Sequence, residues 1–138
     1  MKCQLFHGNN TMLIDNILHI DINNLDSDAY PAGCMSEIFI IDTLSRCTDE
    51  KMHEVLSFAI AKLRLGGEIV IQDIDIDALC RNTFDRTISK EEFNSCISHR
   101  SHIHSVADIK DIMLANNMII IMIEQINSNY LLKCTNHE

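Results

Sequence analysis

Several residue types are scarce in this chain, and each scarcity argues against a class of protein. The 138 residues contain no tryptophan, one proline and four glycines. Lys and Arg number 11 against 20 Asp and Glu, which gives a formal net charge of −9. Binding to a phosphate backbone needs clustered Lys and Arg. The deficit of basic residues therefore argues against nucleic acid or an anionic membrane as the main partner.

Long hydrophobic runs and paired cysteines are also missing. The longest apolar stretch, 118–123, is far too short to span a bilayer, and no basic segment followed by an apolar one opens the chain. The cysteines form no CxxC pair, and their even spread is typical of small core residues in a reducing compartment. We therefore expect a cytoplasmic protein whose thiols are reduced and mostly buried. These thiols belong to Cys3, Cys34, Cys47, Cys80, Cys96 and Cys134.

The length and the order of the apolar patterns predict one α/β domain over residues 1–138. The turn at 126–129 makes the last two strands an antiparallel pair, while the earlier strands alternate with helices. A mostly parallel sheet closed by an antiparallel strand follows from this order. In chain order we predict strands over 2–6, 17–22 and 37–42, a helix over 49–65, a strand over 68–73, one helical turn over 76–80, helices over 89–96 and 107–116, and strands over 118–124 and 129–134.

The segment 62–75, KLRLGGEIVIQDID, is the most informative part of the chain. We expect Gly66 and Gly67 to take positive φ and to stop the preceding helix. The apolar run that follows is typical of a buried central strand, and Asp73 and Asp75 stand at its carboxyl end. Ligands of open α/β sheets bind outside the carboxyl ends of the strands. The segment therefore indicates both the fold class and the position of a site.

Five segments match, in order, the motifs of one enzyme family. Residues 36–46, SEIFIIDTLSR, are similar to a strand followed by a "VLEH" turn, and residues 62–71 to "LkpGG-x-l-x-i". Residues 21–25, DINNL, are similar to "D-L-x-x-L", while 88–93 and 107–118 are similar to a late "s-eef" helix and to the approach to a hairpin. Over residues 17–134 this ordered set resembles the class I S-adenosylmethionine-dependent methyltransferases, especially short, divergent ones common in phage and bacterial genomes.

The resemblance implies a reduced Rossmann-like methyltransferase sheet, S-adenosylmethionine as cofactor, and methyl transfer to a small molecule or glycan. Departures from the family pattern lie at its glycine-rich turn, which is commonly "LG-x-G". Residues 5–9, LFHGN, keep only Gly8, and the helix and one strand that should follow are missing. Asp21 can therefore correspond either to the acid that holds the ribose or to the later Asp beside the adenine. Residues 43–46, TLSR, lack the Glu and His of "VLEH".

Cofactor-binding candidates lie at the ends of the first two predicted strands. His7, Gly8 and Asn9 form a turn whose backbone N–H groups can approach the amino-acid end of the cofactor, although Gly-Asn is also an ordinary turn dipeptide. Asp21, followed by Ile22, ends an apolar strand, where a carboxylate can accept two ribose hydroxyl hydrogen bonds. The competing interpretation of Asp21 is a solvated turn residue or a helix cap.

Catalytic candidates lie at the ends of the next two strands. Asp42 and Thr43 follow a buried strand, where they can contact the cofactor and where Asp42 can orient the acceptor. Asp73 is the candidate general base among the alternating carboxylates Asp73, Asp75 and Asp77. The competing interpretation of these three is an acidic rim, because alternation along a strand scatters side chains to different faces.

A histidine-rich segment suggests two further interpretations. Cys96, His99, His102 and His104 have ligand types that suit zinc, but their spacing matches no standard zinc pattern. We predict no metal here and favour a lid over the site. Besides methyl transfer, the sequence leaves open a catalytically inactive binding or assembly module with the same fold, for example a homodimer, and a metal-binding regulator built on this segment.

Overall fold

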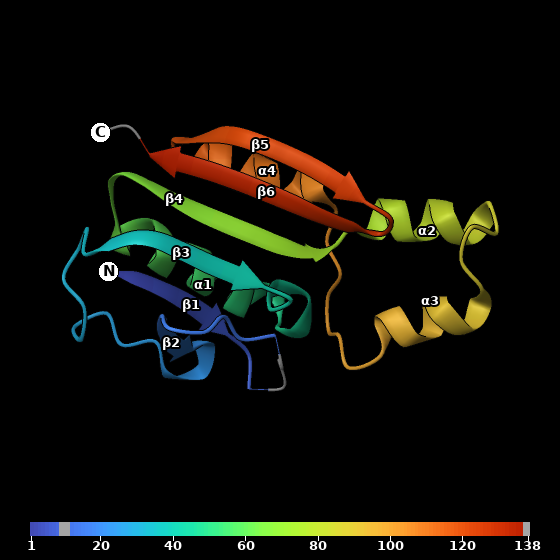
Figure 1. Ribbon diagram of the computed structural model, residues 1–138, viewed down its shortest axis with the longest axis horizontal. Coiled ribbons are helices and arrows are strands. Elements are labelled where there is room, and N and C mark those ends of the chain that lie inside the picture. The colour runs from blue at the N-terminus through green and yellow to red at the C-terminus, as the bar shows by residue number, and fades with distance from the viewer. Residues whose placement is uncertain (9–11, 137–138) are drawn as a thin grey trace.

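The computed structural model describes residues 1–8 and 12–136, whose strands form one six-stranded sheet in the order β2-β1-β3-β4-β6-β5 (Figure 1). Strands β1, β2, β3 and β4 run parallel, and β6 pairs antiparallel with both β4 and β5. The predicted fold class, a mostly parallel Rossmann-like sheet with a C-terminal antiparallel hairpin, is confirmed. The strands are β1 (Lys2–Phe6), β2 (Leu18–Asp21), β3 (Met35–Ile41), β4 (Leu63–Ile74), β5 (Met118–Ile126) and β6 (Asn129–Asn136).

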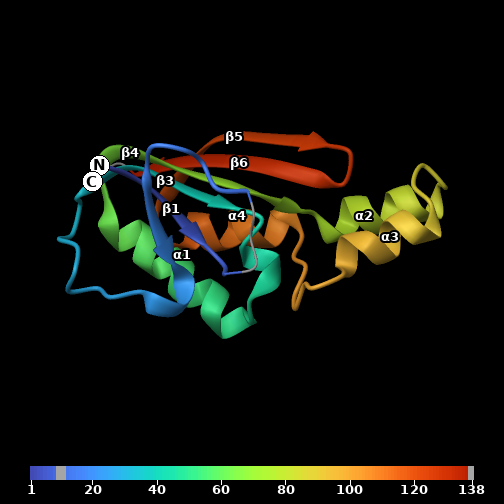
Figure 2. The same cartoon turned by 60° about the horizontal axis from the view of Figure 1, so that its bottom comes forward.

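The helices are distributed unevenly around this sheet. Helices α1 (Asp49–Lys62) and α4 (Val106–Ala115) lie on the same face of the sheet, whereas α2 (Ile76–Phe84) and α3 (Lys90–Ile97) form an arm beyond the carboxyl ends of the parallel strands (Figures 1 and 2). Two short 3₁₀ helices are also present: η1 (Ile22–Asn24) follows β2 directly, and η2 (Leu44–Arg46) is separated from β3 by two residues. No helix that the structure describes is long and apolar enough to cross a membrane.

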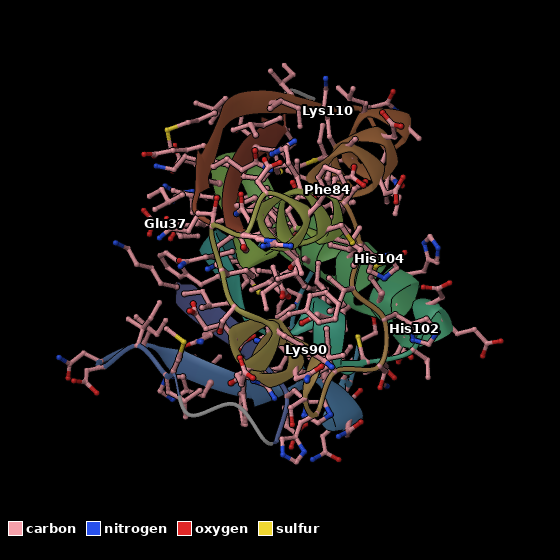
Figure 3. All side chains as sticks on the ribbon, turned by 90° about the vertical axis from the view of Figure 1, so that its right-hand side faces the viewer. Glu37, Phe84, Lys90, His102, His104 and Lys110 are labelled. Atoms are coloured by element: carbon pink, nitrogen blue, oxygen red, sulfur yellow. The ribbon has the colours of Figure 1, made fainter. Side chains whose placement is uncertain are left out.

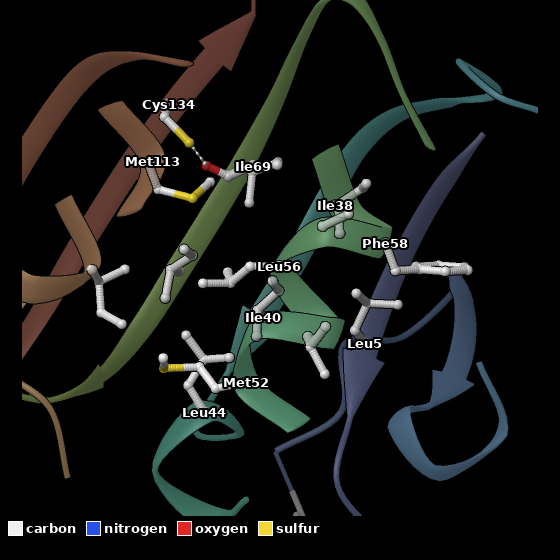
Figure 4. Close-up of a cluster of buried hydrophobic side chains, with 14 of the residues drawn as sticks. Leu5, Ile38, Ile40, Leu44, Met52, Leu56, Phe58, Ile69, Met113 and Cys134 are labelled. Atoms are coloured by element: carbon white, nitrogen blue, oxygen red, sulfur yellow. Dashed lines mark hydrogen bonds between the residues drawn. The ribbon is translucent and has the colours of Figure 1, made fainter. Parts of the chain in front are cut away.

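The hydrophobic core lies between the sheet and the helices α1 and α4, which cover one of its faces. Ile38, Ile40 and Ile69 point from β3 and β4 toward Leu56 of α1, and all four side chains are buried (Figure 4). On the same side the Cys134 thiol donates to the backbone oxygen of Ile69 at 3.8 Å. Burial raises the pKa of Cys134 to about 12, which makes its thiol a poor nucleophile.

The opposite face is open because the connection from β1 to β2 contains no helix in its described part. Residues 12–14 instead pass over β1, where the Gln4 side chain donates to Met12 O at 2.9 Å and accepts from Ile14 N at 2.8 Å. These two contacts give hydrogen-bond partners to the Gln4 side-chain amide, which is completely buried. All six cysteines are free thiols, of which three are buried and only Cys80 is exposed.

The structure corrects the prediction for the glycine pair. Helix α1 ends at Lys62, before Leu65, and β4 begins at once with Leu63. Gly66 has φ +76°, but Gly67 does not have positive φ, so that prediction was wrong. Gly67 already belongs to the extended strand, where a Cβ atom would lie 2.9 Å from Ser36 O and 3.0 Å from Arg64 O. Glycine is required at position 67 because nearby backbone atoms approach it closely, and not because its φ is positive.

A second difference concerns the segment after β4. The single helical turn predicted over 76–80 is a nine-residue helix, α2, that continues to Phe84. Asp75 begins it by accepting a hydrogen bond from Asp77 N at 3.1 Å, the usual role of an Asp at the N-cap. The Asp75 carboxylate also accepts from Gln125 Nε2 of β5. Asp75 therefore has a structural role that joins the arm to the sheet.

Candidate functional site

The carboxyl ends of β1 and β2 bring a glycine turn against a carboxylate. Phe6 and Asp21 are register partners, so the turn that follows Phe6 lies next to Asp21. A Cβ atom at Gly8 would lie 4.0 Å from Asp21 Oδ2 and would meet no other atom within that distance in the part of the chain described. Asp21 Oδ1 caps η1 by accepting from Asn23 N at 3.0 Å. Asn9, the third residue of the predicted turn, lies outside the described residues.

A cavity of about 290 Å³ adjoins this turn. His7 and Asn23 contribute from the ends of β1 and β2, Arg46 and Thr48 from the segment that leads into α1, and Ser101 from the connection between α3 and α4. The volume is close to the lower end of the range of about 300–1,000 Å³ that is usual for small-molecule and cofactor sites. Ile22 does not reach this cavity with its side chain, which is fully buried in the core.

Asp42 stands at the end of β3 in an uncommon backbone conformation. Its φ is +50°, a left-handed value that Asp tolerates better than most residues and that tends to occur at functional sites. Its backbone N–H donates to Gln72 O at 2.8 Å, which fixes the turn against β4. The neighbouring Thr43 is fully buried, and its hydroxyl donates to Ile41 O at 2.9 Å. Thr43 can therefore contribute to a ligand only by its backbone.

Two arginines hold the Asp42 carboxylate. Arg46 Nη2 lies 2.7 Å from Oδ2, and Arg100 Nη2 lies 2.6 Å from Oδ1. The side chains of Asp42, Arg46 and Arg100 are only 17%, 14% and 12% exposed, so the pairs are mostly shielded from solvent. Each oxygen of the carboxylate therefore has its own guanidinium partner. Asp42 is thus suited to organising the site by holding the two arginines.

Asp73, at the end of β4, differs from Asp42 in that backbone N–H groups, rather than arginines, contact its carboxyl group. Its side chain is 4% exposed, with Oδ2 accepting from Ser45 N at 3.1 Å and Oδ1 from Ile74 N at 2.8 Å. Burial raises the pKa of Asp73 and the nearby Asp42 charge adds to the shift, while the hydrogen bonds from Ser45 and Ile74 oppose it. A carboxyl group with a raised pKa is the better candidate for accepting a proton near neutral pH.

The two predicted catalytic residues line one small cavity of about 160 Å³. Asp42, Asp73 and Arg100 lie on it, together with Gln72 of β4 and Asn129 of β6. Sequence reasoning missed Arg100, although it lies among the histidines that drew attention to its segment. With only 11 basic residues in the chain, an arginine flanked by histidines was a signal that could have been used.

None of the histidines of this segment lines this cavity, and His102 and His104 lie beside α1 (Figure 3). The rings of His102 and His104 stack with centroids 6.4 Å apart, and His104 Nε2 lies 3.3 Å from Asp49 Oδ1. Among the described residues, no three His, Cys, Asp or Glu side chains are grouped as a metal site would require. The backbone N–H groups of Ser101 and His102 donate to Ser45 O at 2.8 and 3.2 Å, which anchors the segment across η2. Its role as a lid stays a prediction.

Comparison with known proteins identifies the fold. No protein-family model matches the sequence, and no curated protein is similar to it in sequence. Among solved structures, an O-methyltransferase family protein from Burkholderia thailandensis superposes with a TM-score of 0.64 at 14% identity, covering 89% of this chain and 36% of that one. A possible histamine N-methyltransferase from Thermotoga maritima gives 0.59 at 13%, covering 87% and 63%.

A third similar structure is the magnesium protoporphyrin IX methyltransferase of Synechocystis with bound SAH (S-adenosylhomocysteine), with a TM-score of 0.56 at 12% identity and coverage of 87% and 50%. The chain therefore has the class I S-adenosylmethionine-dependent methyltransferase fold, as its motifs predicted. It spans between 36% and 63% of the length of these three proteins. Identities this low establish the fold, and the activity has to be argued from the site.

Proposed function

We propose that this chain binds S-adenosylmethionine and transfers its methyl group to a small molecule, a glycan being one class of acceptor. The observation that carries the proposal is the Gly8 turn facing the Asp21 carboxylate, at the carboxyl edge of a methyltransferase fold and beside a cavity of about 290 Å³. Ligands of open α/β sheets bind at this edge.

The residues at this edge fit the cofactor. Asp21 Oδ2 can accept a hydrogen bond from a ribose hydroxyl, because Oδ1 already serves η1 and nothing in the described chain donates to Oδ2. The open space above Gly8 lets a ligand approach the backbone closely, as the amino-acid end of the cofactor requires. When bound, the cofactor supplies a methyl group already activated by a sulfonium. Thr48 and Asn23 would line the remainder of the cavity.

The protein's own contribution is to place the acceptor and to manage its proton. Alignment of an acceptor atom with the methyl group provides most of the acceleration in such a reaction. Asp73 is the group that would receive the proton of a hydroxyl or amine acceptor, since its burial raises its pKa. Asp42 would act as a positioning residue that holds Arg46 and Arg100 in place.

Calorimetry with SAH and S-adenosylmethionine tests the proposal. We expect saturable binding by the wild-type protein and at least tenfold weaker binding by Asp21→Asn. The amide oxygen of Asn can still cap η1 but does not reproduce the second carboxylate oxygen, so the fold should persist. Asp15→Asn makes the same change in an exposed turn and is the matched control. Absence of heat with both ligands at millimolar concentration would contradict the proposal.

A catalytically inactive assembly module is a second candidate, favoured by the exposed apolar edge of the sheet. Ile119, Ile121 and Ile126 of the edge strand β5 are 43%, 49% and 58% exposed. Exposed apolar edge strands tend to pair with other chains. This function predicts a homodimer in sedimentation velocity that Ile121→Lys dissociates, together with no binding of SAH. A monomer that binds SAH would exclude it.

A further inference from the structure

The second cavity contains an arginine with unused donors. Arg100 Nε donates to Ser45 Oγ at 3.2 Å, Nη1 to Cys96 O at 2.5 Å, and Nη2 to Asp42 Oδ1 at 2.6 Å. A guanidinium has five N–H groups, so one on each terminal nitrogen has no acceptor among the described residues. Because the contacts hold the side chain in one conformation, its binding geometry is preorganised. A planar fork of this kind matches the two oxygens of a carboxylate.

Two amides complete the polar lining. Gln72 and Asn129 project from β4 and β6 at the rim of the same cavity, and in the described residues neither side-chain amide hydrogen-bonds to another group. Each can donate an N–H to an oxygen that Arg100 also binds. Ile41 gives the cavity one apolar wall. The lining therefore offers several donors to an oxyanion and a contact for a short carbon chain.

The charge and the size of the cavity further restrict the class of ligand that it can bind. Arg46 and Arg100 balance Asp42 and Asp73 even when both carboxyl groups are ionised, so this cluster has no negative excess in a chain of net charge −9. A volume of about 160 Å³ is small beside the roughly 300–1,000 Å³ of usual small-molecule sites, so this cavity can hold only a small group of a ligand. A carboxylate with a short aliphatic stem fits this space.

We propose that the cavity between Asp42, Asp73 and Arg100 binds a carboxylate group of the methyl acceptor. The assignment as acceptor site rests on the proposed methyl transfer, whereas the binding of a carboxylate does not require the cofactor. The class of substrate is therefore a small organic acid, held by Arg100 and by the amides of Gln72 and Asn129. Asp42 fixes the guanidinium and does not itself contact the acceptor's carboxylate.

A titration with propanoate, followed by NMR of ¹⁵N-labelled protein and by calorimetry in chloride buffer, tests the proposal. We expect saturable millimolar binding that shifts the Arg100 Nε–H signal, no binding of the neutral isostere propanamide, and weaker binding of inorganic phosphate. Asn129→Asp and Gln72→Glu add a negative charge at exposed rim positions without changing size, and each should weaken propanoate binding at least tenfold. Asn94→Asp on the exposed side of α3 is the matched control and should leave it unchanged.

Binding of SAH is measured on the same samples to separate the two proposals. SAH binding without propanoate binding would overturn the carboxylate site and leave the proposed methyl transfer intact. Propanoate binding without SAH binding would support the carboxylate site and contradict the proposed methyl transfer. Equal propanoate affinity in Asn129→Asp and wild type, or tighter binding of phosphate than of propanoate, would also overturn the carboxylate site. Melting temperatures of the variants show whether any loss of binding comes from unfolding.

Discussion

The two faces of the sheet carry alternate residues of the same strands and differ sharply in burial. Ile38, Ile40 and Ile69 lie under α1 and α4 and are fully buried, while their neighbours Phe39 and Val70 on the open face are only partly buried. Phe39 and Val70 are apolar like the isoleucines, although the open face also carries Glu37 and Glu68. For these apolar residues, the degree of burial is therefore decided by what covers the face.

The open face compensates for its missing helices with charge. Lys2 lies 3.4 Å from Glu37, and Lys133 lies 3.9 Å from Glu68. These pairs interrupt the apolar residues of β3, β4 and β6 and are themselves about one third exposed or more. The comparison implies that substitutions on the helix-covered face should be much more costly than substitutions on the open face.

The largest difference is expected from truncating adjacent residues of β4. Ile71→Ala on the covered face should lower the free energy of unfolding by about 2–5 kcal/mol, because it leaves a cavity in a fully buried site. Val70→Ala, whose side chain points to the open face, should cost under about 1 kcal/mol, since solvent can fill the space. Urea unfolding of both variants measures the difference. Equal costs would mean that the open face is covered in solution.

The glycine pair at the start of β4 gives the next largest effect. Gly67→Ala should cost about 1–3 kcal/mol, because its Cβ would lie 2.7 Å from Leu63 Cδ1 and against two backbone oxygens. Gly66→Ala should cost about 1 kcal/mol, since it meets no atom within 4 Å and suffers only from its positive φ. Thermal unfolding of the two variants, side by side, measures the order. The reverse order would contradict close approach as the reason for Gly67.

The order of the elements was predictable because periodicity and turn chemistry are local properties. The strand after Gly67 and the hairpin that ends in β6 were predicted from a few adjacent residues each, and the structure contains both. The sign of φ at Gly67 was not predictable, since it depends on where β4 begins to pair with β3. Local sequence did show that no helix follows β1, but it did not show that the other helices would leave one face of the sheet open.

The placement of the candidate residues in the fold was predictable from the sequence, and their contacts only partly. Asp42 and Asp73 end neighbouring parallel strands, so the topology rule was enough to expect them at one edge. The pairing of Asp42 with Arg100 joins residues 58 positions apart, through a segment whose path over η2 no local pattern encodes. Under the proposed function, that contact gives Asp42 the role of positioning two arginines, where the sequence predicted a group that orients the acceptor.

A smaller effect, on the pH dependence of stability, is expected from Asp73, the buried carboxyl group at the end of β4. Its pKa in the folded state is raised above the ordinary value of 3.8, chiefly by burial. Between these two values the native state binds more protons than the unfolded state, so stability should fall as pH rises through this window and level off above it. Asp73→Asn, which does not titrate, should flatten this part of the curve of melting temperature against pH. An unchanged slope in the variant would place the titration elsewhere.

The smallest effect is expected from the ion pair at the centre of the open face. Lys133 and Glu68 are 33% and 37% exposed and 3.9 Å apart, a geometry in which solvent screens most of the attraction. Glu68→Gln should therefore change the free energy of unfolding by less than about 0.5 kcal/mol, and 0.5 M salt should reduce even that difference. Chemical denaturation at low and high salt measures both quantities. A loss above about 1.5 kcal/mol that salt does not reduce would indicate a desolvated pair, and with it an open face that another molecule covers in solution.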